Sequence, residues 1–513
     1  MGTVAPNSTE ESKGIGVGNT PKELDAGAMF VLKSKGSWLH CGYHLTTSIV
    51  APVLLSLPFA LGLLGWVGGV ICLALAGLVT FYSYNLLSLV LEHNAKLGQR
   101  QLRFRDMARD ILGPGWGKYF VGPLQLWICF GAVIACTLLG GQSLKFIYLL
   151  ANPNGKMKLY EFIMMVGGVV LVLAQMPSFH SLRHINLVSL ILCLAFSACA
   201  AAGSIHIGHS KDAPTRDYSV TGSDKDRVFG TFNAISIIST TYASGIIPEI
   251  QATIAPPVQG KMFKGLCVCY SVIVVTYFGV GISGYWAFGN ESQGTLLSNF
   301  LDSQNRPLLP TWFLVMTNVF TLTQVLAVTL INISQVVDYQ PQLDMSTSRD
   351  MNCHTSLALG PLLLETAYLI WASKKSLSSS AGCAHGFVYL QPTNEVFEKK
   401  FADPKMDQFS KRNIIPRLIF RSLSVIIATF FAAMLPFFGD LMALFGAFGC
   451  IPLDFILPMI FFNVTFKPSK REPIFWVNTC IALASLVLVG VGAIASVRQI
   501  VLDAKKYQLF ANM

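Results

Sequence analysis

Long hydrophobic runs separated by short polar stretches make up most of this chain. Runs of about twenty apolar residues are long enough to cross the hydrocarbon core of a bilayer as helices. We therefore predict an all-α integral membrane protein with eleven membrane-spanning helices. The predicted spans cover residues 38–64, 66–91, 119–150, 160–176, 184–207, 229–254, 262–289, 311–338, 416–436, 439–463 and 473–498.

The first span carries a helix-breaking proline, Pro52, near its middle, and the sixth has a similar interruption around Tyr242 to Glu249, where Pro248 lies. Proline removes a backbone donor and clashes with the preceding turn. Within a bilayer, a broken helix is tolerated where it lines a cavity or is buried in protein. Two interrupted spans in corresponding positions of two halves are the best sequence pointer to a transporter's binding site. A single proline kink in a structural helix is the alternative for each span alone.

The residues around the two breaks are the candidate binding groups. Amide donors at a half-helix terminus suit a carboxylate, and freed carbonyls suit an ammonium group. We expect the substrate carboxylate near the first break and the ammonium near the second. The candidate residues are Thr47, Ser48, Val50, Ala51 and Pro52 at the first break, Tyr242, Ala243, Ser244 and Gly245 at the second, and Thr323 in the eighth span. Polar residues such as Thr323 also join membrane helices together, which leaves a purely structural role open for it.

Two acidic residues inside the predicted spans, Glu249 and Asp454, are candidates for proton coupling or gating. Ionisable side chains within a membrane are costly and usually functional. For Glu249 the alternative is a fixed salt bridge with Lys261 or Lys264, and for Asp454 it is structural capping.

Composition limits the function classes. Charged residues are 12% of the chain, hydrophobic residues are 53%, and the mean hydropathy is +0.55, which is typical of a membrane protein. The twelve cysteines form no CxxC pair, so no metal site is expected. Motifs of hydrolases, nucleotide-binding loops and zinc proteases are also missing, so we predict no enzyme activity and no cofactor.

The net charge of +10 is assigned to loops rather than to a nucleic-acid surface. Basic residues gather in 95–118 and after the sixth and tenth spans, which places those loops and the N-terminus in the cytosol. Residues 1–36 are expected to form a disordered cytosolic tail. Residues 339–388 are expected to be an irregular cytosolic insertion, part of it derived from unspliced sequence.

Several motifs resemble the plant amino acid/auxin permease family. They are Leu55-Ser56-Leu57-Pro58-Phe59-Ala60 followed by Leu64-Gly65-Trp66, and Glu249-Ile250-Gln251-Ala252-Thr253. The run from Ile247 to Thr253, the run from Gly260 to Gly265, and Tyr389-Leu390-Gln391-Pro392-Thr393-Asn394-Glu395 resemble its GABA-transporter branch. The resemblance covers nearly everything from Gly36 to Arg498.

The resemblance implies a LeuT-type fold with two inverted repeats of five helices, 37–207 and 229–463, and an eleventh helix at 473–498. It also implies a proton-coupled symporter that imports GABA or related ω-amino acids across the plasma membrane. Ala51-Pro52-Val53 replaces the glycine-rich break of general amino acid permeases, which favours a longer substrate. A general, proline or basic amino acid permease, sodium coupling, a non-transporting sensor and an endomembrane location remain the alternatives. The amino acid and the lipid bilayer are the expected partners, and the oligomeric state is left open.

Overall fold

The computed structural model describes residues 37–99, 101, 103–173, 183–210, 216–220, 222–252, 254, 259–302, 304–338, 411–506 and 510. The predicted tail at 1–36 and the predicted insertion at 339–388 lie outside these residues.

The described residues are almost entirely helical, with one isolated β-bridge between Leu301 and Pro307. The α-helices are α2 (Trp38–Ile49), α3 (Leu57–Lys96), α4 (Phe104–Leu112), α5 (Pro114–Trp116), α6 (Gly122–Ala151), α7 (Leu159–Leu173), α8 (Arg183–His209), α9 (Asp224–Tyr242), α10 (Ile247–Ala252), α11 (Lys261–Phe288), α12 (Thr311–Asp338), α16 (Lys411–Met434), α17 (Phe438–Phe445), α18 (Leu457–Phe466) and α19 (Pro473–Lys506). Shorter 3₁₀ segments are η1 (Pro52–Ser56), η3 (Gly289–Glu291) and η4 (Leu296–Phe300), and π-helical segments are η2 (Gly117–Val121) and η6 (Gly446–Ile456).

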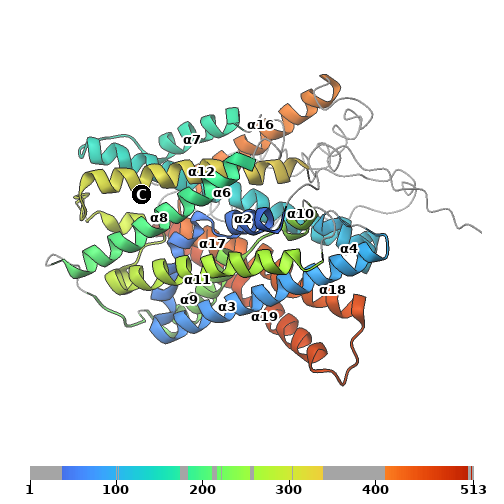
Figure 1. The fold of residues 1–513 in the computed structure, drawn as a ribbon. Coiled ribbons are helices and arrows are strands. Elements are labelled where there is room, and N and C mark those ends of the chain that lie inside the picture. Colours follow the sequence, from blue (N-terminus) through green and yellow to red (C-terminus); the bar gives the residue numbers. More distant parts are fainter. Residues whose placement is uncertain are drawn as a thin grey trace, which may run out of the picture.

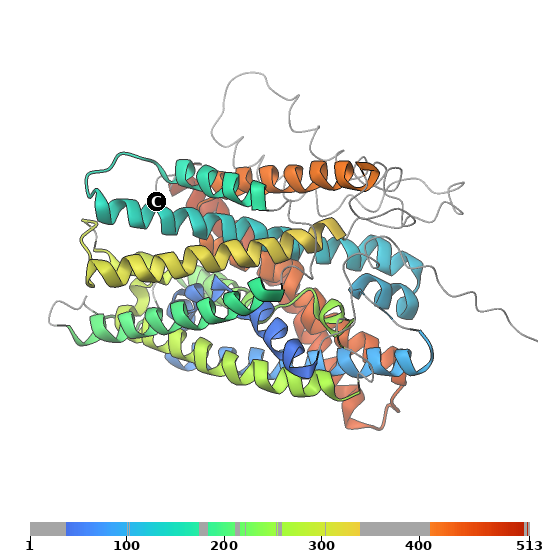
Figure 2. The same cartoon turned by 45° about the horizontal axis from the view of Figure 1, so that its top comes forward.

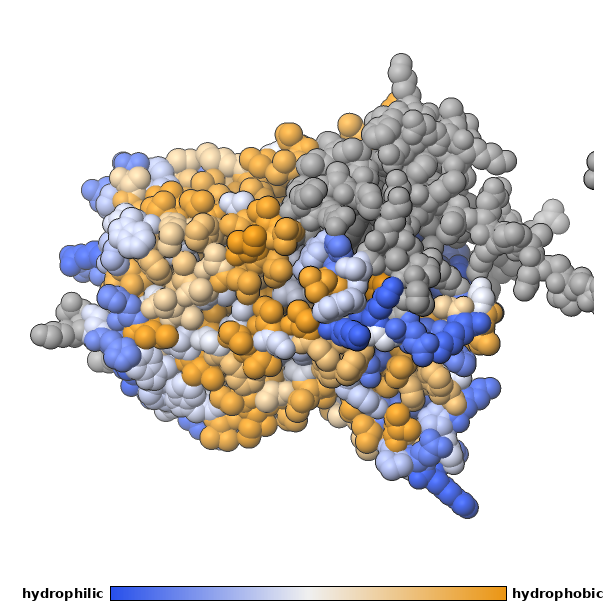
Figure 3. Space-filling model, viewed as in Figure 1, coloured by the Kyte–Doolittle hydropathy of each residue, from blue (hydrophilic) through white to orange (hydrophobic). Residues whose placement is uncertain are grey.

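Each of the eleven predicted spans coincides with helix in the described residues. Six helical stretches are long and apolar enough to cross a membrane, and three shorter apolar helices accompany them. In Figure 3, hydrophobic residues cover the middle of the visible face and hydrophilic residues gather toward both ends. Val67, Val172 and Val275 are each more than 70% exposed, as expected for side chains that face lipid. The prediction of an all-α integral membrane protein is confirmed.

The long helices run roughly side by side along one direction (Figure 1). In the turned view of Figure 2, α6 and α12 lie next to each other along most of their length, and α8 and α11 flank the short helix α2. The broken helices occupy the interior of this bundle, because α2 and α9 are covered by longer neighbours. At the first break, Ile49 and Val50 are buried in protein, a setting in which a broken helix is tolerated within a bilayer.

The boundary between the first two predicted spans lies within one assigned helix rather than between two. The sequence suggested one span at 38–64 and another at 66–91, whereas α3 is assigned as one helix from Leu57 to Lys96. Its backbone leaves the helical region at Gly65, with φ of 72° and ψ of 174°. A residue with a side chain rarely adopts such a φ, so glycine allows the chain to turn between the two spans there.

Residues 95–118 were treated as a loop and instead contain a helix, α4. This helix lies near the far end of the bundle beside α10 and α18 (Figure 1). It is amphipathic, with Phe104, Met107 and Ala108 buried and Asp110 exposed. Since short amphipathic helices form mainly when their apolar face is covered, α4 depends on its contacts with the bundle.

A short loop after α8 lies at the opposite end of the bundle. Tyr218 packs against Trp66 and Tyr285, with ring centroids 5.7 and 5.5 Å away. Ser219 donates two hydrogen bonds to the Asp217 carboxylate, one from its amide and one from its hydroxyl, and these lower the pKa of Asp217. Aromatic rings therefore cover this end of the bundle, and the amphipathic helix α4 covers the other end.

Candidate functional site

The first break lies between α2 and η1. Helix α2 ends at Ile49, Val50 is non-helical, and Ala51 is extended, with φ of −97° and ψ of 164°. Pro52 begins η1, where its missing amide and fixed φ do least harm. The predicted interruption is therefore present, and it separates the first span into two short helical pieces.

The carbonyl groups that this break releases are bonded to side chains from distant helices. Tyr277 of α11 donates its hydroxyl to the carbonyl oxygen of Ile49 at 2.8 Å. Cys193 of α8 donates its thiol to the carbonyl oxygen of Val50 at 3.0 Å. Buried carbonyls need such partners because leaving one unpaired costs about 1–3 kcal/mol. Neutral donors thus stabilise the first break.

The second break lies between α9 and α10. Helix α9 ends at Tyr242, Ala243 is extended with φ of −72° and ψ of 143°, and α10 begins at Ile247. The carbonyl oxygen of Tyr242 accepts a hydrogen bond from the Tyr84 hydroxyl at 2.9 Å. The carbonyl oxygen of Gly245 accepts one from the Gln125 side-chain amide at 2.9 Å. Both predicted interruptions are therefore real, and each is held by donors from other helices.

The two breaks meet. The hydroxyls of Ser48 and Ser244 share a hydrogen bond of 2.8 Å, across 196 residues of sequence. Tyr277 also joins them, because its hydroxyl reaches the carbonyl oxygens of both Ile49 and Thr241. A phenol has one proton, so Tyr277 satisfies one of these two carbonyls fully at any moment.

Accessible surface reaches this meeting point. Ser48, Ala51 and Ala243 are half-buried, whereas Thr47, Val50, Tyr242 and Ser244 are buried. The half-buried residues belong to both breaks and include small side chains. Each break therefore has at least one small residue with accessible surface.

Asp454 lies directly at the second break. It sits in η6, a π-helical stretch that contains Pro452, and its side chain is completely buried. One carboxylate oxygen, Oδ2, accepts a hydrogen bond from the Ser244 amide at 3.3 Å. The other, Oδ1, has no hydrogen-bond partner among the described residues. The carboxylate therefore caps a freed amide and keeps one unused oxygen.

Glu249 lies one turn further along the same broken helix, on α10, and is 5% exposed. Its Oε1 accepts hydrogen bonds from the Gln125 side-chain amide at 2.6 Å and from the Phe104 backbone amide at 3.2 Å. Its Oε2 has no hydrogen-bond partner among the described residues. Arg103 is the cation that acts on it electrostatically.

The alternative role considered for Glu249 was a salt bridge with Lys261 or Lys264. Lys264 is exposed. The hydrogen bonds that the Glu249 carboxylate accepts come from neutral donors of α6 and α4.

The structure brings nearly all of the predicted site residues together, with one clear exception. Thr323 is exposed on α12, and its hydroxyl donates to the carbonyl of Val319 in the same helix at 2.8 Å. Thr323 therefore does not lie where the sequence analysis expected it. Thr321 and Gln324 occupy the buried face of α12, and Gln324 accepts a hydrogen bond from Ser189 at 2.9 Å.

Four residues at the site were not among the sequence candidates: Tyr84, Gln125, Cys193 and Tyr277. Each lies inside a predicted span, and nothing in the local sequence sets it apart from other polar or cysteine residues in those spans. In the described residues, no group of three or more His, Cys, Asp or Glu side chains is placed to hold a metal ion.

Comparison with known proteins gives a consistent picture. The model of a family described as "Transmembrane amino acid transporter protein" matches residues 34–501. The chain is 52% identical to "GABA transporter 1" of Arabidopsis thaliana over 505 residues, covering 98% of this chain and 99% of that protein. It is 26% identical to "Lysine histidine transporter-like 1" of the same plant, covering 96% of this chain and 94% of the relative.

Among solved structures, an outward-open, substrate-bound sialic acid symporter coupled to sodium aligns over 95% of this chain and 94% of its own. The sequence identity is 11% and the TM-score is 0.44, a likeness too slight to support a statement about this chain.

Proposed function

The chain belongs to the transmembrane amino acid transporter family, and from this premise we propose that it imports GABA or a related ω-amino acid together with protons. It is a multi-pass membrane transporter and not an enzyme. The substrate proposal is supported by the 52% identity to a GABA transporter over nearly the whole chain. The plasma membrane is the proposed location.

Transport is proposed to occur by alternating access around the meeting point of the two breaks. The substrate carboxylate lies near Thr47 to Ala51, and its ammonium group near Tyr242 to Gly245. The single observation that carries this proposal is the hydrogen bond between Ser48 and Ser244, because it joins the two interrupted backbones at one point. A bound zwitterion replaces that hydrogen bond with its own polar groups.

Fewer free carbonyl oxygens are available to the ammonium group than the sequence suggested. The carbonyls of Thr241, Tyr242 and Gly245 already accept hydrogen bonds from Tyr277, Tyr84 and Gln125. The ammonium group therefore competes with these donors, or it approaches the unused oxygen of Asp454. An ion pair with that carboxylate is the stronger of the two options, since hydrogen bonds to charged groups contribute about 1.5–3 kcal/mol.

Proton coupling is proposed through Glu249 and Asp454. Both carboxylates are buried at or beside the second break, and each keeps one oxygen without a hydrogen-bond partner. Such residues inside a membrane are expected to carry function. Moving one charge across 100 mV yields about 2.3 kcal/mol, which supports roughly fifty-fold accumulation.

Sodium coupling is the less favoured mechanism on this geometry. A sodium ion at the first break needs carbonyl oxygens as ligands. The carbonyls of Ile49 and Val50 already accept hydrogen bonds from Tyr277 and Cys193. No coupling ion other than the proton, and no cofactor, enters the proposal.

The repeats at 37–207 and 229–463 are proposed to be related by inverted symmetry. The order of elements supports this, since a broken helix opens each set of five spans. The eleventh helix, at 473–498, then lies outside both repeats.

Basic amino acids form a second candidate substrate class, because relatives at 26% identity are named lysine histidine transporter-like. Purified protein in liposomes tests both candidates, with uptake of labelled GABA, proline and lysine measured under an imposed proton or sodium gradient. We expect GABA to accumulate with the proton gradient alone. Uptake that follows sodium and ignores external pH would reject the coupling assignment.

A further inference from the structure

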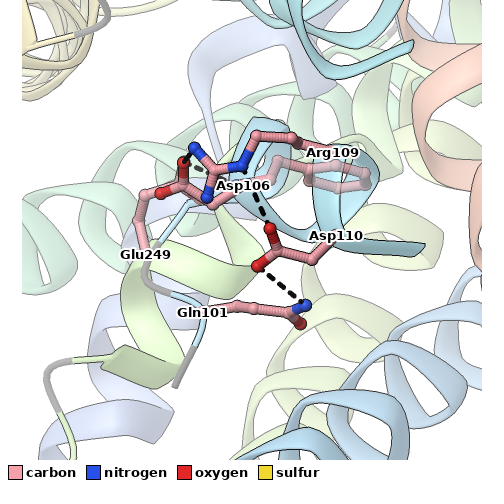
Figure 4. A network of polar contacts seen from close by, with 6 residues as sticks. Gln101, Asp106, Arg109, Asp110 and Glu249 are labelled. Atoms are coloured by element: carbon pink, nitrogen blue, oxygen red, sulfur yellow. Dashed lines mark hydrogen bonds and ion pairs between the residues drawn. The ribbon is translucent and has the colours of Figure 1, made fainter. Parts of the chain in front are cut away.

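The start of α4 is completed by a residue from another part of the chain. Its own N-cap residue, Arg103, provides no side-chain hydrogen bond to the helix. Instead, the first amide, that of Phe104, donates to the Glu249 carboxylate at 3.2 Å, across 145 residues. A carboxylate at this position satisfies an orphan amide and complements the positive end of the helix. Figure 4 shows Glu249 beside the polar residues of α4.

Other contacts hold α4 against helices that are not broken. The Phe104 ring packs against Phe461 of α18, with centroids 5.9 Å apart. Gln101 links α4 to the end of α3, since it accepts a hydrogen bond from Asn94 at 3.0 Å and donates one to Asp110 at 3.5 Å. Glu249 is therefore a contact through which a broken helix acts on the first turn of α4.

Gln125 connects that contact to the second break. Its side-chain nitrogen donates both to the carbonyl of Gly245 at 2.9 Å and to Glu249 Oε1 at 2.6 Å. A primary amide has two N–H groups, so both bonds form at once. Gln125 is 5% exposed and comes from α6, which is not interrupted in the described residues. Through these two hydrogen bonds, Gln125 links the backbone at the second break to Glu249, which caps α4.

We propose that Gln125 is a positioning residue that couples the second break to closure of the predicted cytosolic end by α4. When the backbone at Gly245 moves during transport, Gln125 moves the Glu249 carboxylate and so weakens the cap on α4. The helix then leaves the end of the bundle and opens the cytosolic path. This inference rests on the proposed transport function.

The test measures how often α4 leaves the bundle. Ala108 is fully buried on α4, so a cysteine introduced there reacts with a membrane-impermeant maleimide only when α4 is displaced. In inside-out vesicles carrying Ala108→Cys, we expect Gln125→Leu to raise the labelling rate about tenfold. Its maximal uptake rate falls, because movement at the second break no longer reaches the cap on α4.

Two further variants separate coupling from packing. Gln125→Glu keeps the shape of the side chain but places an acceptor beside Glu249, so it labels as fast as Gln125→Leu. Gln142→Leu is the matched control on the same helix. Gln142 accepts a hydrogen bond from Thr295 at 3.2 Å, far from α4, so this variant labels like the parent. The vesicles without Ala108→Cys give the background from native cysteines.

Parental labelling and uptake in both Gln125→Leu and Gln125→Glu would overturn the inference while leaving the proposed function intact. If Gln125→Leu does not reach the membrane, the labelling rate and uptake of the isosteric Gln125→Glu variant test the inference. If the unsubstituted protein does not take up GABA, that result would instead contradict the proposed function itself.

Discussion

The two breaks have the same backbone defect and different surroundings. At the first break, the released carbonyls accept hydrogen bonds from a thiol and a phenol, and its hydrogen-bond partners are uncharged. At the second, a carboxylate caps the Ser244 amide and a second carboxylate lies one turn away, joined to the break through Gln125. A neutral break suits recognition of a ligand that arrives and leaves unchanged. A break lined by carboxylates suits a step in which charge changes.

The difference divides the expected effects of mutation. Variants of the two carboxylates at the second break are expected to alter coupling and its pH dependence, whereas variants of the uncharged groups at either break are expected to alter apparent affinity.

Glu249→Gln should remove coupling. The amide cannot release or accept the transported proton, so the roughly fifty-fold accumulation available at 100 mV falls to about equilibration. Uptake in liposomes is measured from pH 5.5 to 7.5 and becomes independent of pH. Glu291→Gln on the exposed outer loop is the matched control and keeps the parental profile. Parental kinetics in Glu249→Gln would exclude this residue from the mechanism.

Asp454→Asn should lower the maximal uptake rate about tenfold. The Ser244 amide then bonds to a neutral acceptor instead of a carboxylate, a difference of about 1 kcal/mol or more, and the unused charged oxygen is lost. The initial rate of GABA uptake at saturating substrate measures the effect. A variant that changes only the half-saturating concentration would place Asp454 with the first break instead.

Tyr277→Phe tests whether the breaks are independent, because its hydroxyl reaches carbonyls of both. Its loss removes the one proton that these two buried carbonyls share, at about 1–3 kcal/mol for the group left unsatisfied. We expect a lower unfolding temperature in detergent and about fivefold weaker uptake at low GABA, with the pH profile retained. A flattened pH profile would show that the first break also takes part in coupling.

Ser48→Ala should have the smallest effect, a rise of about threefold in the half-saturating GABA concentration. One neutral hydrogen bond contributes about 0.5–1.5 kcal/mol. Ser244→Ala should behave similarly, and the double variant should add little, since both remove the same bond. Strictly additive effects would mean that the two hydroxyls act separately on the substrate.

The sequence was sufficient to locate both breaks, because proline within an apolar span has few interpretations. It also singled out Glu249 and Asp454, since carboxylates are rare in such spans. It did not identify their partners. Gln125 lies 120 residues before Gly245, and Tyr277 lies 228 residues after Ile49, so only the packing of the helices reveals these contacts.

Two errors have physical causes. Thr323 is exposed on α12, whereas its neighbours Thr321 and Gln324 are buried, and because both faces of α12 carry apolar residues, periodicity does not separate lipid from interior. Helix α4 was missed because six basic residues made 95–118 look like a simple cytosolic loop. Its apolar face became visible only against α18.

The central claim is that substrate binds where the two breaks touch. In a double variant, Ser48→Cys with Ser244→Cys, the thiols replace hydroxyls whose oxygens are 2.8 Å apart, so mild oxidation should form a disulfide that mass spectrometry of the linked peptides detects. We predict that saturating GABA slows formation of this disulfide about tenfold or more, while lactose has no effect. A disulfide that forms equally fast with and without GABA, in a protein that still transports GABA, would contradict the account.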